Sequence, residues 1–186
     1  MRRLKFIQVI AGVALPFPLR AGSPVRKKLE SIEKKSVPSG ETVRFSRQEL
    51  LEFAHEELRE KKVNGIWNPT FTLGTNHATG AATVDFHRLQ ASVQERPPGI
   101  LSRLLLSGAR RVEVEVRLSS ERGWARVDVL SAEVDGWNIE GRALEWLINT
   151  YVMSRYPKAR INEWFELESN VRQVALSPAE LTVLIA

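Results

Sequence analysis

The sequence predicts an α+β fold in which a curved antiparallel sheet wraps around one or two long amphipathic helices. Residues 112–119 alternate apolar and polar side chains, and residues 124–134 resume a strand pattern after a short turn. Residues 139–155 then carry a wide apolar stripe at helical spacing, which a sheet has to cover on most of its circumference. Strand pairs joined by tight turns indicate antiparallel pairing and therefore the α+β class.

The positive charge of the chain lies near its N-terminus. The 186 residues carry a net charge of +5, but residues 1–22 contribute +4 and residues 23–40 contribute +3, so residues 41–186 carry −2. Phosphate-dominated binding needs a clustered positive face, so we expect no nucleic-acid partner. The sequence has no cysteine, which excludes disulfides and thiolate metal sites.

Residues 1–22 resemble a secretory signal peptide. Three basic residues precede an apolar run at 6–15 that is too short to span a bilayer, and small residues follow at 21–23. We therefore expect an exported protein, periplasmic or secreted. The alternative is that this stretch is simply a disordered or core-packed N-terminus.

Residues 23–42 are rich in charge and are expected to form a linker between the leader and one domain at 43–186. The alternative is a short solvated helix, because Val25, Leu29 and Ile32 are spaced closely enough to dock weakly. Its basic residues would also suit a transient contact with a membrane surface.

The first helix is predicted to begin at Ser46. Ser46 and Glu49 have the spacing of a capping box, and Phe45 with Leu50 have that of a hydrophobic staple. One face of this helix is apolar, and Asn64-Gly65 supplies the stop signal.

Two strands, 66–74 and 78–89, are expected to follow around a turn at 74–77. In the second, Asp85 and His87 would share a polar face and could be half of a catalytic or metal site. Since no serine in a nucleophile context and no further ligand accompanies them, we expect a solvated face. The sequence thus predicts a protein that is not an enzyme and has neither metal nor cofactor.

A short apolar segment, 100–107, contains Leu104 and follows a Pro-Pro-Gly break. It either plugs one end of the core or lies at the mouth of an apolar cavity.

The central hairpin is the clearest signal in the sequence. Its first strand places four apolar side chains on one face: Val112, Val114, Val116 and Leu118. In the second strand, Val127 and Val129 share one face, whereas the apolar residues from Leu130 onward share the other, which predicts a bulge near Val129-Leu130.

The rest of the chain completes the sheet. Asn138 is a candidate cap for the helix at 139–155, and Pro157 ends that helix. Short strands are expected at 163–167 and 171–176, with a terminal strand at 181–186 tied into the sheet.

These segments resemble LmeA-like and YceB-like bacterial proteins of the tubular lipid-binding superfamily. Residues 45–51 (FSRQELL) are similar to the helix start of those proteins, and 112–134 leads through Gly136 into an apolar helix as it does there. The stretches similar to their closing strands are 162–167, 171–176 and 181–183. The resemblance implies a strongly curved antiparallel sheet around a long helix, with an apolar groove for acyl chains.

The function expected from these observations is binding of an apolar ligand, a phospholipid or another acyl-chain lipid, in a groove between sheet and helices. The residues expected to line the groove are Leu104, Val114, Val116, Leu144, Leu147, Ile148 and Tyr151. For each of them, ordinary core packing is the alternative.

A second hypothesis is an exported interaction domain of envelope assembly, with a filled core and no ligand. It would act through its sheet edge or through Trp137 and Trp164, because tryptophan at loop positions is typical of interfaces.

Overall fold

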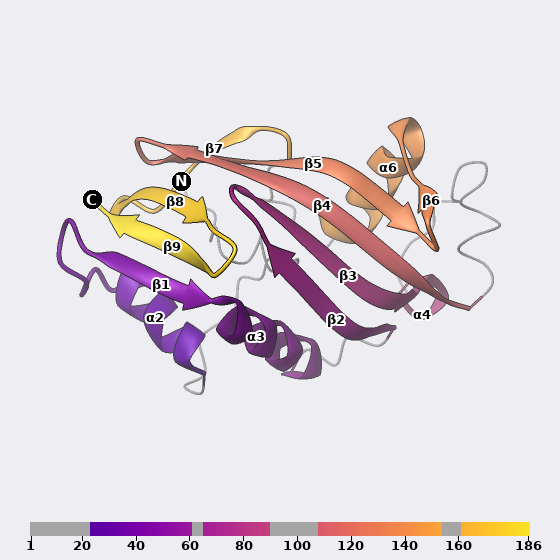
Figure 1. Ribbon diagram of the computed structural model, residues 1–186, viewed down its shortest axis with the longest axis horizontal. Helices are drawn as coiled ribbons and strands as arrows, with labels where there is room; N and C mark the ends of the chain where they lie inside the picture. The colour runs from indigo at the N-terminus through magenta and orange to yellow at the C-terminus, as the bar shows by residue number, and fades with distance from the viewer. Residues whose placement is uncertain (1–22, 61–64, 90–107, 154–160) are drawn as a thin grey trace.

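The computed structural model describes residues 23–60, 65–89, 108–153 and 161–186. Within these residues the chain is an α+β protein with antiparallel sheets, which confirms the predicted class (Figure 1). The signal-peptide prediction for 1–22 and the segment 100–107 lie outside the described residues.

The strands form two sheets rather than the single one expected. The small sheet has the order β1-β9-β8, with β1 at Thr42–Ser46, β9 at Glu180–Ile185 and β8 at Val171–Leu176. The large sheet has the order β2-β3-β4-β5-β6, with bounds Ile66–Leu73, His77–Asp85, Ala109–Glu121, Trp124–Val134 and Trp137–Asn138. β7, at Trp164–Glu166, pairs with the start of β5. The predicted closing strands are therefore present, but the terminal strand β9 belongs to the small sheet.

The β4–β5 hairpin has the predicted turn and the predicted bulge. Arg122 and Gly123 both have positive φ angles, 46° and 81°, as a type I′ hairpin turn requires. Farther along, Val116 faces Val129 whereas the preceding β4 residue faces Ser131, so Leu130 is the extra residue of a bulge.

The segment expected to be a charged linker is instead a packed helix. α2 spans Pro24–Glu33, and its Val25 and Ile32 are buried in the main core. The guanidinium of Arg26 is buried as well and forms an ion pair with Glu57 of the next helix at 2.5 Å. The amphipathic spacing of this segment thus outweighs its charged composition. A helix is present, as the alternative expected, but it is packed into the core rather than solvated.

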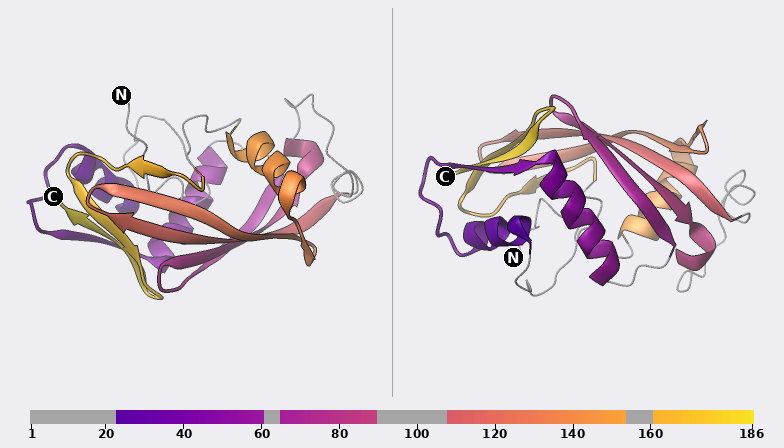
Figure 2. Two further views of the ribbon diagram at one scale, coloured as in Figure 1. Left: turned by 90° about the horizontal axis from the view of Figure 1, so that it is seen from above. Right: turned by 60° about the horizontal axis from the view of Figure 1, so that its bottom comes forward.

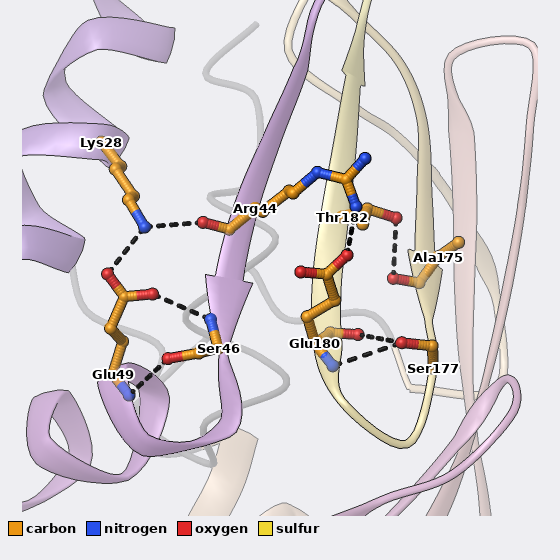
Figure 3. Close-up of polar contacts among 8 residues, drawn as sticks. All are labelled: Lys28, Arg44, Ser46, Glu49, Ala175, Ser177, Glu180 and Thr182. Atoms are coloured by element: carbon orange, nitrogen blue, oxygen red, sulfur yellow. Dashed lines mark hydrogen bonds and ion pairs between the residues drawn. The ribbon is translucent and has the colours of Figure 1, made fainter.

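The predicted capping box opens α3, which spans Arg47–Glu60. The Ser46 hydroxyl accepts the Glu49 N–H at 3.2 Å, and a Glu49 carboxylate oxygen accepts the Ser46 N–H at 2.8 Å (Figure 3). Phe45 and Leu50 are both fully buried, as the staple requires. The stop signal at 64 and 65 falls at the boundary of the described residues.

Charged side chains cover the outer edge of β1. Lys28 of α2 donates to the Arg44 carbonyl oxygen at 2.7 Å and to the Glu49 carboxylate at 2.6 Å (Figure 3). β1 pairs with β9 on its other side only, so this ion pair lies across a free sheet edge. Such charges hinder the addition of a strand from another chain.

The helix predicted at 139–155 begins two residues later than expected, and its end lies outside the described residues. α6 spans Gly141–Leu147 and continues as a π-helix, η1, over Ile148–Met153. Asn138 does not cap it, because the turn after β5 places Asn138 in β6, opposite Glu133. No α6 side chain is fully buried, so the expectation that the sheet covers most of its circumference is wrong.

Two apolar cores hold the molecule together. The first lies among the small sheet, α2, α3 and the hairpin end of β4 and β5. The second lies at the other end of the large sheet, under α6 and the short helix α4 at Phe86–Leu89. Figure 2 shows the helices of the first core, α2 and α3, and those of the second core, α4 and α6, on the same side of the large sheet. We call this side the inner face.

The capping box should make the folded protein less stable at acidic pH. Burial raises the pKa of Glu49, but hydrogen bonds from Lys28 and from Ser46 outweigh it and hold that pKa below its ordinary value of 4.5. The Glu49 carboxylate therefore binds a proton more readily in the unfolded chain than in the folded one. The stabilisation that the ionised carboxylate provides is complete above pH 4.5 and is lost as pH falls through the pKa that Glu49 has in the folded protein. We expect Glu49→Gln to lower the free energy of unfolding by less than about 1 kcal/mol at pH 7, because glutamine can still accept the Ser46 N–H but loses the ion pair with Lys28.

Urea unfolding of wild type and Glu49→Gln at pH 7 and pH 3 measures this effect. The difference between the two proteins should shrink at pH 3. Glu52→Gln, an exposed change on the same helix, is the control. An equal difference at both pH values would contradict the role assigned to the Glu49 carboxylate.

Candidate apolar binding face

Small residues form the middle of the inner face. Ala78, Gly80 and Ala82 alternate along β3 and lie opposite Val116, Val114 and Val112 of β4, respectively. On the other side, Phe71 of β2 lies opposite Gly80. Larger apolar side chains therefore flank a central strand of small ones, as in a trough.

The space above Gly80 is open. Among the residues that the structure describes, no heavy atom would lie within 4 Å of a Cβ atom placed on Gly80, although its cross-strand neighbours Phe71 and Val114 carry large apolar side chains. Phe71, Val112, Val114 and Val116 are only half-buried, whereas Leu118 on the same face of β4 is buried. The centre of the inner face is thus less filled than either core.

Two of the predicted lining residues lie beside Gly80, because Val114 is opposite Gly80 and Val116 is opposite Ala78. Val114 packs on the second core and Val116 on the first, so the pair spans the region between the cores. Leu144 and Leu147 of α6 are half-buried against the second core, and Ile148 is half-buried at the start of η1. Leu104 and the side chain of Tyr151 lie outside the described residues.

The sequence analysis missed Gly80, Phe71 and the alanines beside them. The available signal was the alternation of small residues at 78, 80 and 82, which follows the period of a strand. Small side chains give little hydrophobic signal, and only the cross-strand register shows that larger ones surround them.

The Asp85 and His87 arrangement expected on one strand face is wrong. β3 ends at Asp85, and residues 86–89 turn into α4. The Asp85 carboxylate accepts the backbone N–H of Arg88 at 3.1 Å and pairs with its guanidinium at 3.4 Å, so it caps this helical turn. The described ranges contain no cluster of three His, Cys, Asp or Glu side chains that could hold a metal ion.

Four tryptophans are exposed on the large sheet. Trp137, expected in a loop, lies in the short strand β6, and Trp164 lies in β7, within the strand predicted at 163–167. Trp164 lies opposite Arg126 and diagonal to Trp124, so these three side chains share the outer face of the sheet. Trp67 of β2 lies below the Arg88 guanidinium, 5.6 Å from its ring centre.

Asp135 fixes the turn that precedes Trp137. Its carboxylate accepts the backbone N–H of Arg111 at 2.9 Å and the Arg110 guanidinium at 2.8 Å. The backbone hydrogen bond from Arg111, together with Arg110, holds the pKa of Asp135 below its ordinary value against the opposing effect of burial. The carboxylate therefore joins the β5–β6 turn to the start of β4.

No protein-family model matches the chain, and no curated protein or solved structure matches it significantly. None of the helices in the ranges that the structure describes is long and apolar enough to cross a membrane.

The half-burial of Val114 leads to a stability prediction. We expect Val114→Ala to lower the free energy of unfolding by less than about 1 kcal/mol, because the side chain has open space beside it. Val134→Ala removes the same atoms from the second core, where Val134 is 1% exposed, and should cost about 2 kcal/mol. Chemical denaturation of the ligand-free protein compares them. Equal costs would mean that Val114 is ordinary core.

Proposed function

We propose that this chain is an exported, non-enzymatic protein that binds an apolar ligand on its inner face. The ligand class is a phospholipid or another acyl-chain lipid. The observation that carries the proposal is the open space above Gly80, flanked by the half-buried side chains of Phe71 and Val114.

The chemistry of this face suits an alkyl chain. On the inner face, the trough residues of β2, β3 and β4 are apolar or glycine, so an occupant gains no hydrogen bonds from side chains there. Each methylene buried in the trough contributes about 0.8 kcal/mol before the cost of ordering the chain, so the gain grows with the length of alkyl chain that the trough covers. From Ala78 to Ala82 the trough would run along β3 for roughly 13 Å.

The proposal includes a finer description of the fold. The large sheet would curve around α3 and the α6–η1 segment, and the acyl chain would lie between them. The resemblance to LmeA-like and YceB-like proteins supports this arrangement, and the signal-like residues 1–22 support export. Ile148 would line the helical side.

Native mass spectrometry of the protein purified from its own envelope tests the function directly. We expect a bound mass that organic extraction identifies as a lipid, at one or two molecules per chain. A ligand-free mass, unchanged after incubation with phospholipid vesicles, would overturn the proposal.

A charge placed in the trough should abolish uptake. Val114→Asp puts a carboxylate beside the open space, and an isolated charge in apolar surroundings is strongly unfavourable. We expect uptake of a fluorescent fatty acid to fall at least about tenfold. Glu115→Gln, on the outer face of the same strand, is the matched control and should bind normally. Circular dichroism and thermal unfolding establish that both variants are folded.

A second candidate function has one observation in its favour. Trp124 and Trp164 are 48% and 43% exposed and share the outer face with Arg126, a combination typical of protein-interaction hot spots. Under this hypothesis the chain is an interaction domain of envelope assembly. A Trp124→Ala, Trp164→Ala variant would then lose its cross-linked partner in the envelope while its lipid content stayed unchanged.

A further inference from the structure

The cross-strand register gathers aromatic and basic residues at one end of the large sheet. Ile66, beside Trp67, lies opposite Val84, and Val84 lies opposite Arg110. The next residue, Arg111, donates its backbone N–H to Asp135 of the β5–β6 turn. We call this end the rim and define it by five residues: Trp67, Arg88, Arg110, Arg111 and Trp137.

Trp137 is held rigidly although it is 60% exposed, the highest value among the large apolar side chains that the structure shows as exposed. It pairs with Val134, which is 1% exposed in the second core. Asp135 and Gly136 between them have φ angles of 51° and 80°, as in a tight type I′ turn. A tryptophan projected into water from so fixed a position indicates a contact surface.

The second tryptophan of the rim lies at the opposite edge of the sheet. Trp67 belongs to β2 and Trp137 to β6, with three strands between them, so their strands are roughly 19 Å apart. Trp67 lies opposite Thr83 and therefore on the outer face, whereas its neighbour Ile66 lies with Val112 on the inner face, where both are only half-buried. The rim is therefore continuous with the apolar face.

We propose that the rim is the surface through which this protein contacts a phospholipid bilayer, with Trp137 and Trp67 as its interfacial anchors. This inference rests on the proposed function, since a lipid has to enter the apolar face from a membrane. Trp is enriched at bilayer interfaces because its ring is apolar and its N–H is polar.

The charges of the rim suit zwitterionic head groups. Arg88 pairs with Asp85, and Arg110 and Arg111 pair with Asp135 and Glu113. Phosphocholine likewise carries one negative and one positive group, so guanidinium and carboxylate side by side match it without a net positive patch. The aliphatic stems of the arginines can lie along the apolar part of the interface.

The opposite end of the sheet provides a contrast. Trp124 and Trp164 are exposed there too, but the inner face beneath them is filled by buried Leu118, Val127 and Phe165 of the first core. These tryptophans are therefore matched internal controls.

The experiment uses the protein isolated from the envelope of cells grown with 5-fluorotryptophan. The sequence has five tryptophans, and single Trp→Phe variants assign their fluorine resonances. Phosphatidylcholine vesicles that carry a nitroxide-labelled lipid are then added. We expect the Trp137 and Trp67 signals to broaden, and those of Trp124 and Trp164 to remain sharp. Selective broadening of Trp124 and Trp164, or of none, would overturn the rim assignment.

Vesicle flotation tests the same surface by mutation. Trp137→Ala should weaken binding to phosphatidylcholine vesicles about five- to tenfold, whereas Trp124→Ala should leave it unchanged. Equal binding by both variants would overturn the proposal. Fatty-acid uptake from detergent micelles distinguishes this failure from failure of the proposed function. If the protein takes up fatty acid but its vesicle binding does not depend on the rim, the proposed function stands and only the membrane-contact proposal for the rim is rejected.

Discussion

The alternation of side chains along β4 is the constraint on which both cores depend. Its inner face supplies Leu118 and Val116 to the first core and Val112 and Val114 to the second, so one strand connects them. A slip of one residue in its pairing would send all four side chains to the outer face. The tight turn at Arg122-Gly123 fixes that register at the hairpin end, and the bulge at Leu130 fixes it within β5.

The ion pairs of α2 have a different physical role from the apolar packing. A buried pair such as Arg26–Glu57 gains little net stability, because desolvation offsets most of the attraction. Removing Glu57, however, would leave the buried Arg26 guanidinium with a longer ion pair to Glu56, at 3.4 Å, as its carboxylate contact. The pair therefore fixes where α2 lies on α3 more than it strengthens the attachment. Val25 and Ile32, buried in the first core, supply the apolar contribution to that attachment.

Features specified by neighbouring residues were predictable from the sequence. The Ser46–Glu49 capping box and the bulge at Leu130 follow from local spacing, and both are present. Features decided by tertiary contacts were not. The spacing of Asp85 and His87 predicted one strand face, but the chain turns into α4 after Asp85. Asn138 was predicted to cap a helix, but it pairs with Glu133 in β6. The residues next to Asp85 or Asn138 in the sequence do not determine which backbone or side-chain group lies near enough to form a hydrogen bond in the folded chain.

The candidate site illustrates the same limit. Val114 and Val116 were identifiable because apolar residues at strand spacing mark a face, but the feature that leaves room beside them is Gly80. A missing side chain has no hydrophobic signal of its own. The space that Gly80 leaves depends on the neighbouring strands, because a larger residue in its place would lie between the side chains of Phe71 and Val114. Binding space in a sheet of this kind thus arises where small residues of one strand pair with large residues of its neighbours. If the proposed function is correct, the half-buried walls would leave part of an occupant exposed, which would favour exchange of the ligand over permanent retention.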